Sequence, residues 1–259
     1  MKKETLIGAI VLLVIVSGVI FYGATSSSPS KAPETADLSA LSGTSYVEHA
    51  PYYDIAVNYA SSTPLLGKVS ASADAAAVAL MKHFVSDAVA QFKTDGNFAN
   101  LTAADVKTMG LSQSRKETLE IKYLISSSPR TVSYIFTTYE DTLGAHGNTF
   151  FRTFTFDTST GTLLSLADLF APGSDYLSRL SSISRAELPA VIGDSAATSF
   201  IASGTTPSDK NFENFFLDNA SLVVLFPPYQ VAPYSAGPQT LRIKVTDLAN
   251  FLKPEYRQQ

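Results

Sequence analysis

The sequence predicts an α+β fold, in which an antiparallel β-sheet carries two main helices packed on it, plus one N-terminal transmembrane helix. Three observations lead to this class. An uncharged, strongly apolar run, residues 5–22, opens the chain. Two later stretches, 74–93 and 175–191, carry apolar residues at helical spacing. Much of the remaining chain alternates apolar and polar residues with the period of two that is typical of strands.

The apolar run has the length of a membrane-spanning helix. At about 1.5 Å of rise per residue, residues 5–24 extend roughly 30 Å, the thickness of a bilayer core. Lys2 and Lys3 precede the run and no basic cluster follows it, so residues 1–4 are expected in the cytoplasm and the rest outside. A cleaved signal peptide is the alternative, although Tyr22 stands where its cleavage site needs a small residue. Either interpretation exports the remaining chain, and the first places it at the cell membrane.

The exported part divides into a linker, a domain and a tail. Residues 25–45 are rich in Ser, Pro, Thr and Ala, which is typical of a flexible linker. We expect the domain at 46–253, with halves that meet at about residues 145 and 146, and a tail at 254–259. We expect the halves to form one cooperative unit, because each alone would leave sheet edges open.

Local signals set the order of elements in the first half. A strand is expected over residues 52–59, where apolar and polar residues alternate. Asp74 is expected to cap the first main helix and Gly96 to end it. Thr102 can then cap a short helix that Gly110 closes. Three strands follow as an antiparallel meander; they are expected near residues 118–125, 131–140 and 149–157.

The second half begins after a tight turn at Gly161, which suits a positive φ. The second main helix covers about residues 175–191, and Pro189 is expected to end or kink it. Further strands are expected at 212–217, 222–226 and 241–245, before a short helix at 246–252.

The composition excludes several classes of function. The formal net charge is −4 and no basic stripe is present, so nucleic acid is not an expected partner. The chain has no Cys, which excludes disulfides and thiolate metal sites. The only imidazoles, His49, His83 and His146, are too widely spaced for a metal motif, and no cofactor is expected. Neither a nucleophile elbow nor a phosphate loop is found, so no residue is assigned a catalytic role.

The most distinctive segment joins two predicted strands and reads PPYQVAPYSAG, residues 227–237. Its prolines cannot sit inside a sheet, so the chain is forced into an ordered loop that carries Tyr229 and Tyr234. Such rings stack on sugars or anchor protein interfaces, or they fill the edge of the sheet. His146 lies beside Gly147, where the backbone can approach a ligand closely. Tyr229, Tyr234 and His146 are therefore the candidate ligand-binding residues.

Three blocks of sequence resemble one known family. The blocks are Phe154–Asp157 with Gly161 and Leu166–Phe170, then Phe212–Leu217 with Leu222–Phe226, then Pro228–Gly237 with the strand after it. Over about residues 45–253 the chain resembles a domain of unknown function found in two places. One is the extracellular domain of the sigma-V anti-sigma factor, a lysozyme receptor. The other is the N-terminal accessory domain of peptidoglycan deacetylases.

The resemblance implies a membrane-anchored extracytoplasmic domain that binds or senses an envelope component without catalysis. A peptidoglycan fragment or a lysozyme-like protein is the implied partner. Two departures limit the comparison. Residues 1–4 are too few to bind a sigma factor, and Thr158 stands where the deacetylase motif has its second aspartate.

Two other functions stay open. A hydrolase of wall sugars, or a deacetylase-like enzyme, would bring His146 within hydrogen-bonding reach of a carboxylate. A role in assembling a partner membrane protein would use helix packing at Gly8 and Gly18.

Overall fold

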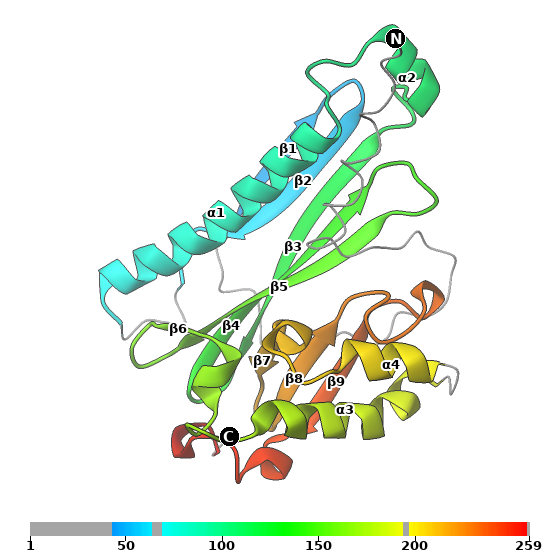
Figure 1. Cartoon of the computed structure of the whole chain (residues 1–259). Helices are drawn as coiled ribbons and strands as arrows, with labels where there is room; N and C mark the ends of the chain where they lie inside the picture. Colours follow the sequence, from blue (N-terminus) through cyan, green and yellow to red (C-terminus); the bar gives the residue numbers. More distant parts are fainter. Residues whose placement is uncertain (1–42, 64–68, 194–196, 258–259) are drawn as a thin grey trace, which may run out of the picture.

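The computed structural model describes residues 43–63, 69–193 and 197–257, which form a mixed α+β fold (Figure 1). Two β-sheets and four α-helices are present in these residues. The expected single sheet is therefore corrected to two. The predicted transmembrane segment and residues 25–42 of the linker lie outside the described residues. Among the described helices, none combines the length and the apolar character that crossing a bilayer requires.

The first sheet has six strands in sequence order. They are β1 (Gly43–His49), β2 (Tyr53–Ala60), β3 (Glu117–Ser127), β4 (Thr131–Asp141), β5 (Asn148–Asp157) and β6 (Leu163–Leu164). The three predicted strands of the meander are confirmed as β3, β4 and β5. All pairs are antiparallel except β2 and β3, which run parallel. The purely antiparallel expectation is wrong here because α1 (Ala71–Asp95) and α2 (Ala103–Met109) form a crossover that returns the chain in the same direction.

The ends of α1 and α2 show which capping signals the fold uses. Ser70 caps α1, since its hydroxyl accepts a hydrogen bond from the Ala73 N–H. Asp74, the predicted cap, instead accepts hydrogen bonds from the backbone and hydroxyl of Thr63. Gly96 follows α1 as expected. The caps of α2 are also confirmed: Thr102 forms a capping box, and Gly110 adopts a φ of +66°.

One face of the first sheet packs against α1. The buried helix residues Ala77, Met81, Val85 and Phe92 follow helical spacing and meet inward side chains of β2 to β5. Phe84 lies against two of these, with ring centroids 5.4 Å from Phe136 and 5.8 Å from Phe154. This aromatic core holds α1 beside β5, where the cleft described below is found.

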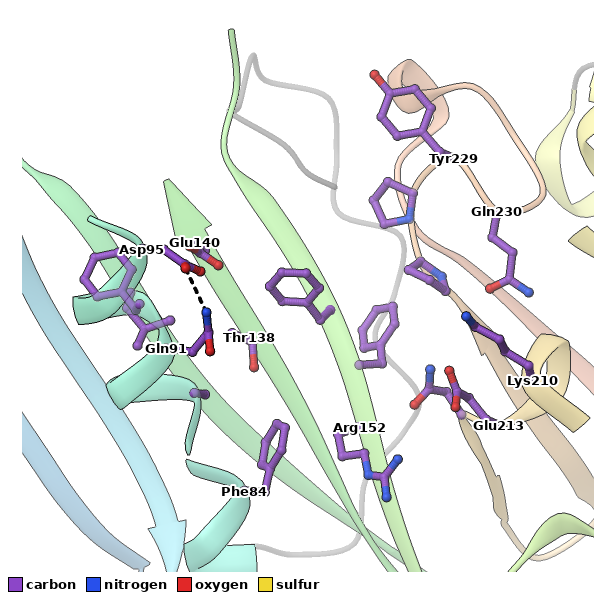
Figure 2. A pocket seen from close by; sticks show the side chains of 18 of the residues that line it. Phe84, Gln91, Asp95, Thr138, Glu140, Arg152, Lys210, Glu213, Tyr229 and Gln230 are labelled. Atoms are coloured by element: carbon purple, nitrogen blue, oxygen red, sulfur yellow. Dashed lines mark hydrogen bonds between the residues drawn. The ribbon is translucent and has the colours of Figure 1, made fainter. Parts of the chain in front are cut away.

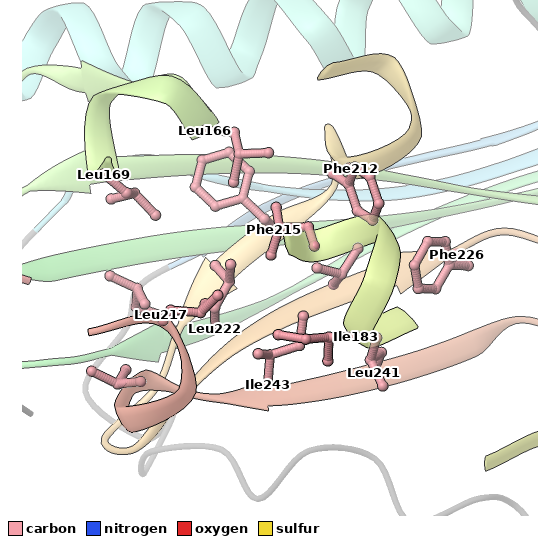
Figure 3. Close-up of a cluster of buried hydrophobic side chains, with 14 of the residues drawn as sticks. Leu166, Leu169, Ile183, Phe212, Phe215, Leu217, Leu222, Phe226, Leu241 and Ile243 are labelled. Atoms are coloured by element: carbon pink, nitrogen blue, oxygen red, sulfur yellow. The ribbon is translucent and has the colours of Figure 1, made fainter. Parts of the chain in front are cut away.

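The second sheet has three antiparallel strands and its own core (Figure 3). The strands are β7 (Phe215–Leu217), β8 (Ser221–Phe226) and β9 (Gln239–Lys244), with helices α3 (Tyr176–Ile192) and α4 (Thr198–Gly204). The predicted strand from residue 212 is shorter because Asp209–Phe212 forms a 3-10 turn, and the expected last helix is reduced to the 3-10 turn Val245–Leu248. Pro189 lies inside α3, which ends only at Gly193.

A third, smaller cluster joins the two sheets. Ile135 of β4 packs with three side chains of the second sheet, Phe216, Val223 and Leu225, and Phe151 of β5 covers the edge. Polar contacts reinforce the junction. The Phe215 N–H donates to the Thr153 hydroxyl oxygen at 3.1 Å, and the Thr155 hydroxyl donates to the Phe215 carbonyl at 3.2 Å. The first sheet is thus covered by α1 on one face and by the second sheet on the other.

The domain boundaries differ from those expected. Residues 43–45 belong to β1 rather than to the linker, because they pair with β2. The predicted tail is packed: Tyr256 is only 3% exposed, and its hydroxyl donates to the Asp157 carboxylate at 3.2 Å. The sheets also divide the chain after β6, and not at residues 145 and 146.

Candidate functional site

A cleft of about 830 Å³ opens along β5 (Figure 2). One wall is the C-terminal half of α1, with Phe84, Gln91 and Asp95, together with the neighbouring ends of β3 and β4. The opposite wall consists of residues 210–214 and the loop at 227–230. The cleft therefore lies where the first sheet, its helix and the second sheet meet.

A cluster of three aromatic rings lies at one end of this cleft, where His146 and Tyr229 line it and Tyr234 stacks on both. The imidazole of His146 and the ring of Tyr234 have centroids 3.7 Å apart with an angle of 23° between their planes. Tyr229 stacks on Tyr234 at 5.3 Å and lies 6.3 Å from His146. The structure thus brings together the three residues that the sequence singled out, from two loops more than eighty residues apart. A ligand role for them stays a prediction.

The backbone that carries these rings is strained. Tyr229 has a φ of +66° and Leu143, in the loop of His146, has a φ of +59°. Such conformations are uncommon for residues other than glycine and cost about 1–3 kcal/mol each. The Gln230 side chain holds the tyrosine loop by donating to the carbonyls of Gly204 and Asn211, both at 2.9 Å. The fold therefore holds Tyr229 in place while leaving it 41% exposed.

His146 faces neutral groups. Its Nδ1 lies 3.3 Å from the Gly147 carbonyl, to which an N–H at this position donates, and its Nε2 lies 3.4 Å from the Tyr229 hydroxyl. Within the described part of the chain, no hydrogen bond joins His146 to a carboxylate. The other imidazoles, His49 and His83, pair with exposed aspartates elsewhere. No group of three potential metal ligands is found in the same residues.

Carboxylates that form no ion pair with the described residues lie on the α1 side of the cleft. Glu140 of β4 and Asp95 of α1 both line it. Burial raises the pKa of Glu140, and the nearby charge of Asp95 raises it further. Glu117, which is only 2% exposed, lies behind them. Its burial, with smaller contributions from Glu140 and Asp141, raises the pKa of the Glu117 carboxyl to about 7.

Sequence reasoning missed this acidic corner because its members come from three separate elements. One signal was present. Glu117 has the same inward parity along β3 as Leu119 and Ile121, which are fully buried, and a charged residue at an inward position is rare unless paired.

The shifted pKa of Glu117 makes a testable prediction. A carboxyl whose folded pKa is raised destabilises the fold as pH rises from its unfolded value near 4.5 through about 7, because the folded state resists ionisation. Glu117→Gln should therefore increase the free energy of unfolding by about 2–3 kcal/mol at pH 8. At pH 4 it should change that free energy little. Chemical denaturation at both pH values, with the exposed Glu213→Gln as control, measures the difference. An equal effect at both pH values would contradict the assignment.

Comparison with known proteins finds a family match for part of this chain. Residues 167–246, which contain the second sheet and the tyrosine loop, match the model of a protein family of unknown function, DUF3298. The chain is also 33% identical over 143 residues to the peptidoglycan-N-acetylmuramic acid deacetylase PdaC of Bacillus subtilis (strain 168). That match covers 55% of this chain but 31% of the enzyme, so the chain spans about a third of its relative.

A solved structure shares the fold. A DUF3298 protein from Bacteroides fragilis superposes with a TM-score of 0.56 at 18% identity, over 83% of this chain and 95% of that one. A second, from Pseudomonas aeruginosa PAO1, gives a TM-score of 0.48 at 15% identity, over 83% and 96% of the two chains. Residues 167–246 of the chain therefore match the DUF3298 family of unknown function, and a 143-residue stretch is homologous to a peptidoglycan deacetylase.

Proposed function

We propose that this chain is a non-catalytic recognition domain of the bacterial cell envelope, and that its cleft binds a fragment of peptidoglycan. The observation that carries the proposal is the cluster of His146, Tyr229 and Tyr234 at one end of the cleft. Aromatic faces with a polar handle suit partly apolar ligands such as sugars. The carboxylates, amides and Arg152 that line the cleft supply the few polar groups that fix a ligand's orientation.

The relative adds support from a different direction, since its name describes an enzyme that acts on peptidoglycan. In this proposal the chain is exported and held at the membrane by residues 5–24. Residues 25–42 then set how far the domain reaches from the membrane.

The first test is sedimentation of the full chain, in detergent micelles, with purified peptidoglycan sacculi. We expect binding that persists at physiological salt. Tyr229→Ala and Tyr234→Ala should each weaken it about tenfold, which corresponds to a loss of about 1.4 kcal/mol of binding free energy. Tyr46→Ala is the matched control, because Tyr46 is 40% exposed on β1 and lies outside the cleft. No binding to sacculi would remove the proposal.

A protein ligand is the second candidate, because Tyr229 is an exposed large aromatic side chain of the kind that dominates protein interfaces. Hen lysozyme, in place of sacculi in the same experiment, tests this reading. Binding to lysozyme but not to sacculi would indicate that the ring cluster contacts a protein partner instead of a sugar.

A hydrolase remains the enzymatic alternative, and one observation favours it. Glu140, whose pKa is raised by burial, lines the cleft together with the more exposed Asp95, and glycoside hydrolysis uses a pair of carboxyl groups. Release of reducing sugars from sacculi by the full chain, lost in Glu140→Gln, would establish this activity in place of simple binding.

A further inference from the structure

We propose that the cleft takes the peptide stem of peptidoglycan, bound as an extended strand along the outer edge of β5 with a free ammonium group at the acidic corner. This inference rests on the proposed function and names the part of the ligand that the cleft recognises. Three features carry it: the open edge of β5, the two walls beside that edge, and the distribution of charge.

The edge of β5 is open over the half of the strand that lies in the cleft. Alternate residues of a strand direct their N–H and C=O groups to opposite neighbours. The Asp157 N–H bonds the Thr162 carbonyl on the outer side, whereas the Thr158 N–H bonds Arg130, which precedes β4. Odd-numbered residues of β5 therefore point outward.

β6 covers only part of this outer side, since it pairs with Thr155 and Phe156 alone. Nearer the start of β5, Thr149 and Phe151 direct their backbone groups away from β4. In residues 43–63, 69–193 and 197–257, no strand pairs with Thr149 or Phe151 on this side, and no hydrogen bond reaches their outward backbone groups. An exposed edge of this kind is a template for an added strand.

The two walls supply places for the side chains of such a strand. Successive side chains of an added strand point to opposite faces of the sheet. On one face they meet Phe84 of α1 and Phe150 of β5; on the other they meet Phe151, Pro227 and Tyr229. Both sets line the cleft, so an extended peptide contacts apolar surface on each side while its backbone bonds β5.

The charges in the cleft distinguish a peptide from a neutral glycan. Among the described residues, no hydrogen bond or ion pair reaches the Glu140 carboxylate, and the Asp95 carboxylate accepts a hydrogen bond from the Gln91 amide at 2.7 Å. Arg152 on β5 lies over the ring of Phe154 and forms no ion pair within the same residues. A peptide stem carries both carboxylates and the ammonium of a diamino acid. Its ammonium complements Glu140 and Asp95, and its carboxylates complement Arg152.

The geometry also selects a long amine. Neighbouring strands lie about 4.8 Å apart, so an added strand would lie about 10 Å from the backbone of β4, which carries Glu140. A short amine cannot cover this distance. A lysine-like side chain that passes over β5 on the α1 face reaches the carboxylate.

The test uses the full chain in detergent micelles and three probes. The first is the lysine-type stem peptide L-Ala-γ-D-Glu-L-Lys-D-Ala, the second is the same peptide acetylated on its lysine amine, and the third is chitotetraose, a glycan without peptide. Affinity is measured by calorimetry, and backbone protection by hydrogen–deuterium exchange. We expect the free-amine peptide to bind at least fivefold more tightly than the acetylated one, and to slow exchange at Thr149 and Phe151.

Variants give the decisive comparison. Glu140→Gln should remove the preference for the free amine, whereas Glu187→Gln, at an exposed position of α3 outside the cleft, should preserve it. Thr149→Pro removes an outward N–H at a position where an edge strand tolerates proline, and should abolish binding of both peptides. Circular dichroism and thermal melting establish that each variant is folded.

Each of the other outcomes overturns a specific part of the proposal. Binding of the peptide without protection of β5 removes strand addition. Binding of chitotetraose alone removes the peptide proposal and leaves the proposed function intact, whereas loss of binding to sacculi as well removes both. If the unmodified chain binds no peptide but forms dimers that Thr149→Pro dissociates, the edge of β5 pairs with a second copy of this chain instead.

Discussion

Gly204→Ala is expected to destabilise the domain by about 3 kcal/mol or more. A Cβ built at Gly204 would lie 1.9 Å from the carbonyl oxygen of Gln230 and 2.7 Å from its carbonyl carbon. Because both are backbone atoms, no side-chain rotation relieves the overlap. Chemical denaturation of the full chain measures the loss in the free energy of unfolding.

The same substitution should also reduce binding, because Gly204 supports the tyrosine loop. Its carbonyl accepts a hydrogen bond from the Gln230 side chain, and a shift of Gln230 displaces its neighbour Tyr229. Gly144→Ala is the control. That glycine lies close to His146 in sequence, and a Cβ there meets no atom within 4 Å. Equal unfolding midpoints for Gly204→Ala and the unmodified chain would show that the loop does not lie against α4 as described.

Phe216→Ala is expected to cost about 3–5 kcal/mol and to separate the unfolding of the two sheets. Phe216 is 1% exposed and belongs to the small cluster between the sheets, with Ile135, Val223 and Leu225. Removing its ring weakens the contact that makes the sheets unfold together. We expect one transition for the unmodified chain and two, or one broadened transition with a lower m-value, for the variant.

Phe212→Ala provides the matched comparison for that experiment. Phe212 is also fully buried, but it belongs to the core of the second sheet. A similar loss of stability with a single sharp transition is expected for it. If Phe216→Ala also unfolds in one sharp transition with an unchanged m-value, coupling between the sheets does not depend on this cluster.

Much of the fold could be predicted from local patterns. Alternation of apolar and polar residues located β2 to β5, and capping residues such as Thr102 and Gly110 located α2, because these signals act between near neighbours. The pairing of β2 with β3 could not be predicted in this way. It depends on where α1 packs, and a repeat of two residues carries no information on whether two strands run parallel or antiparallel.

The candidate site was predictable to a similar extent. Prolines and tyrosines marked the loop of Tyr229 and Tyr234, and the glycine beside His146 marked the other loop. Their stacking adds a contact that no single-sequence pattern specifies. The acidic corner and the open edge of β5 were not anticipated, since each depends on which elements the tertiary fold brings together and which strand ends early.

The crossover between β2 and β3 also has a consequence for how the chain acquires its structure. The hairpin of β1 and β2 is synthesised first, but its pairing partner β3 follows only after α1 and α2. Contacts so distant in sequence form slowly, because loop closure precedes the stabilising contacts. The meander of β3, β4 and β5 has short connections and is expected to nucleate folding. Until it forms, the nascent hairpin presents an unprotected β2 to other chains, which makes this interval the period of greatest risk of aggregation.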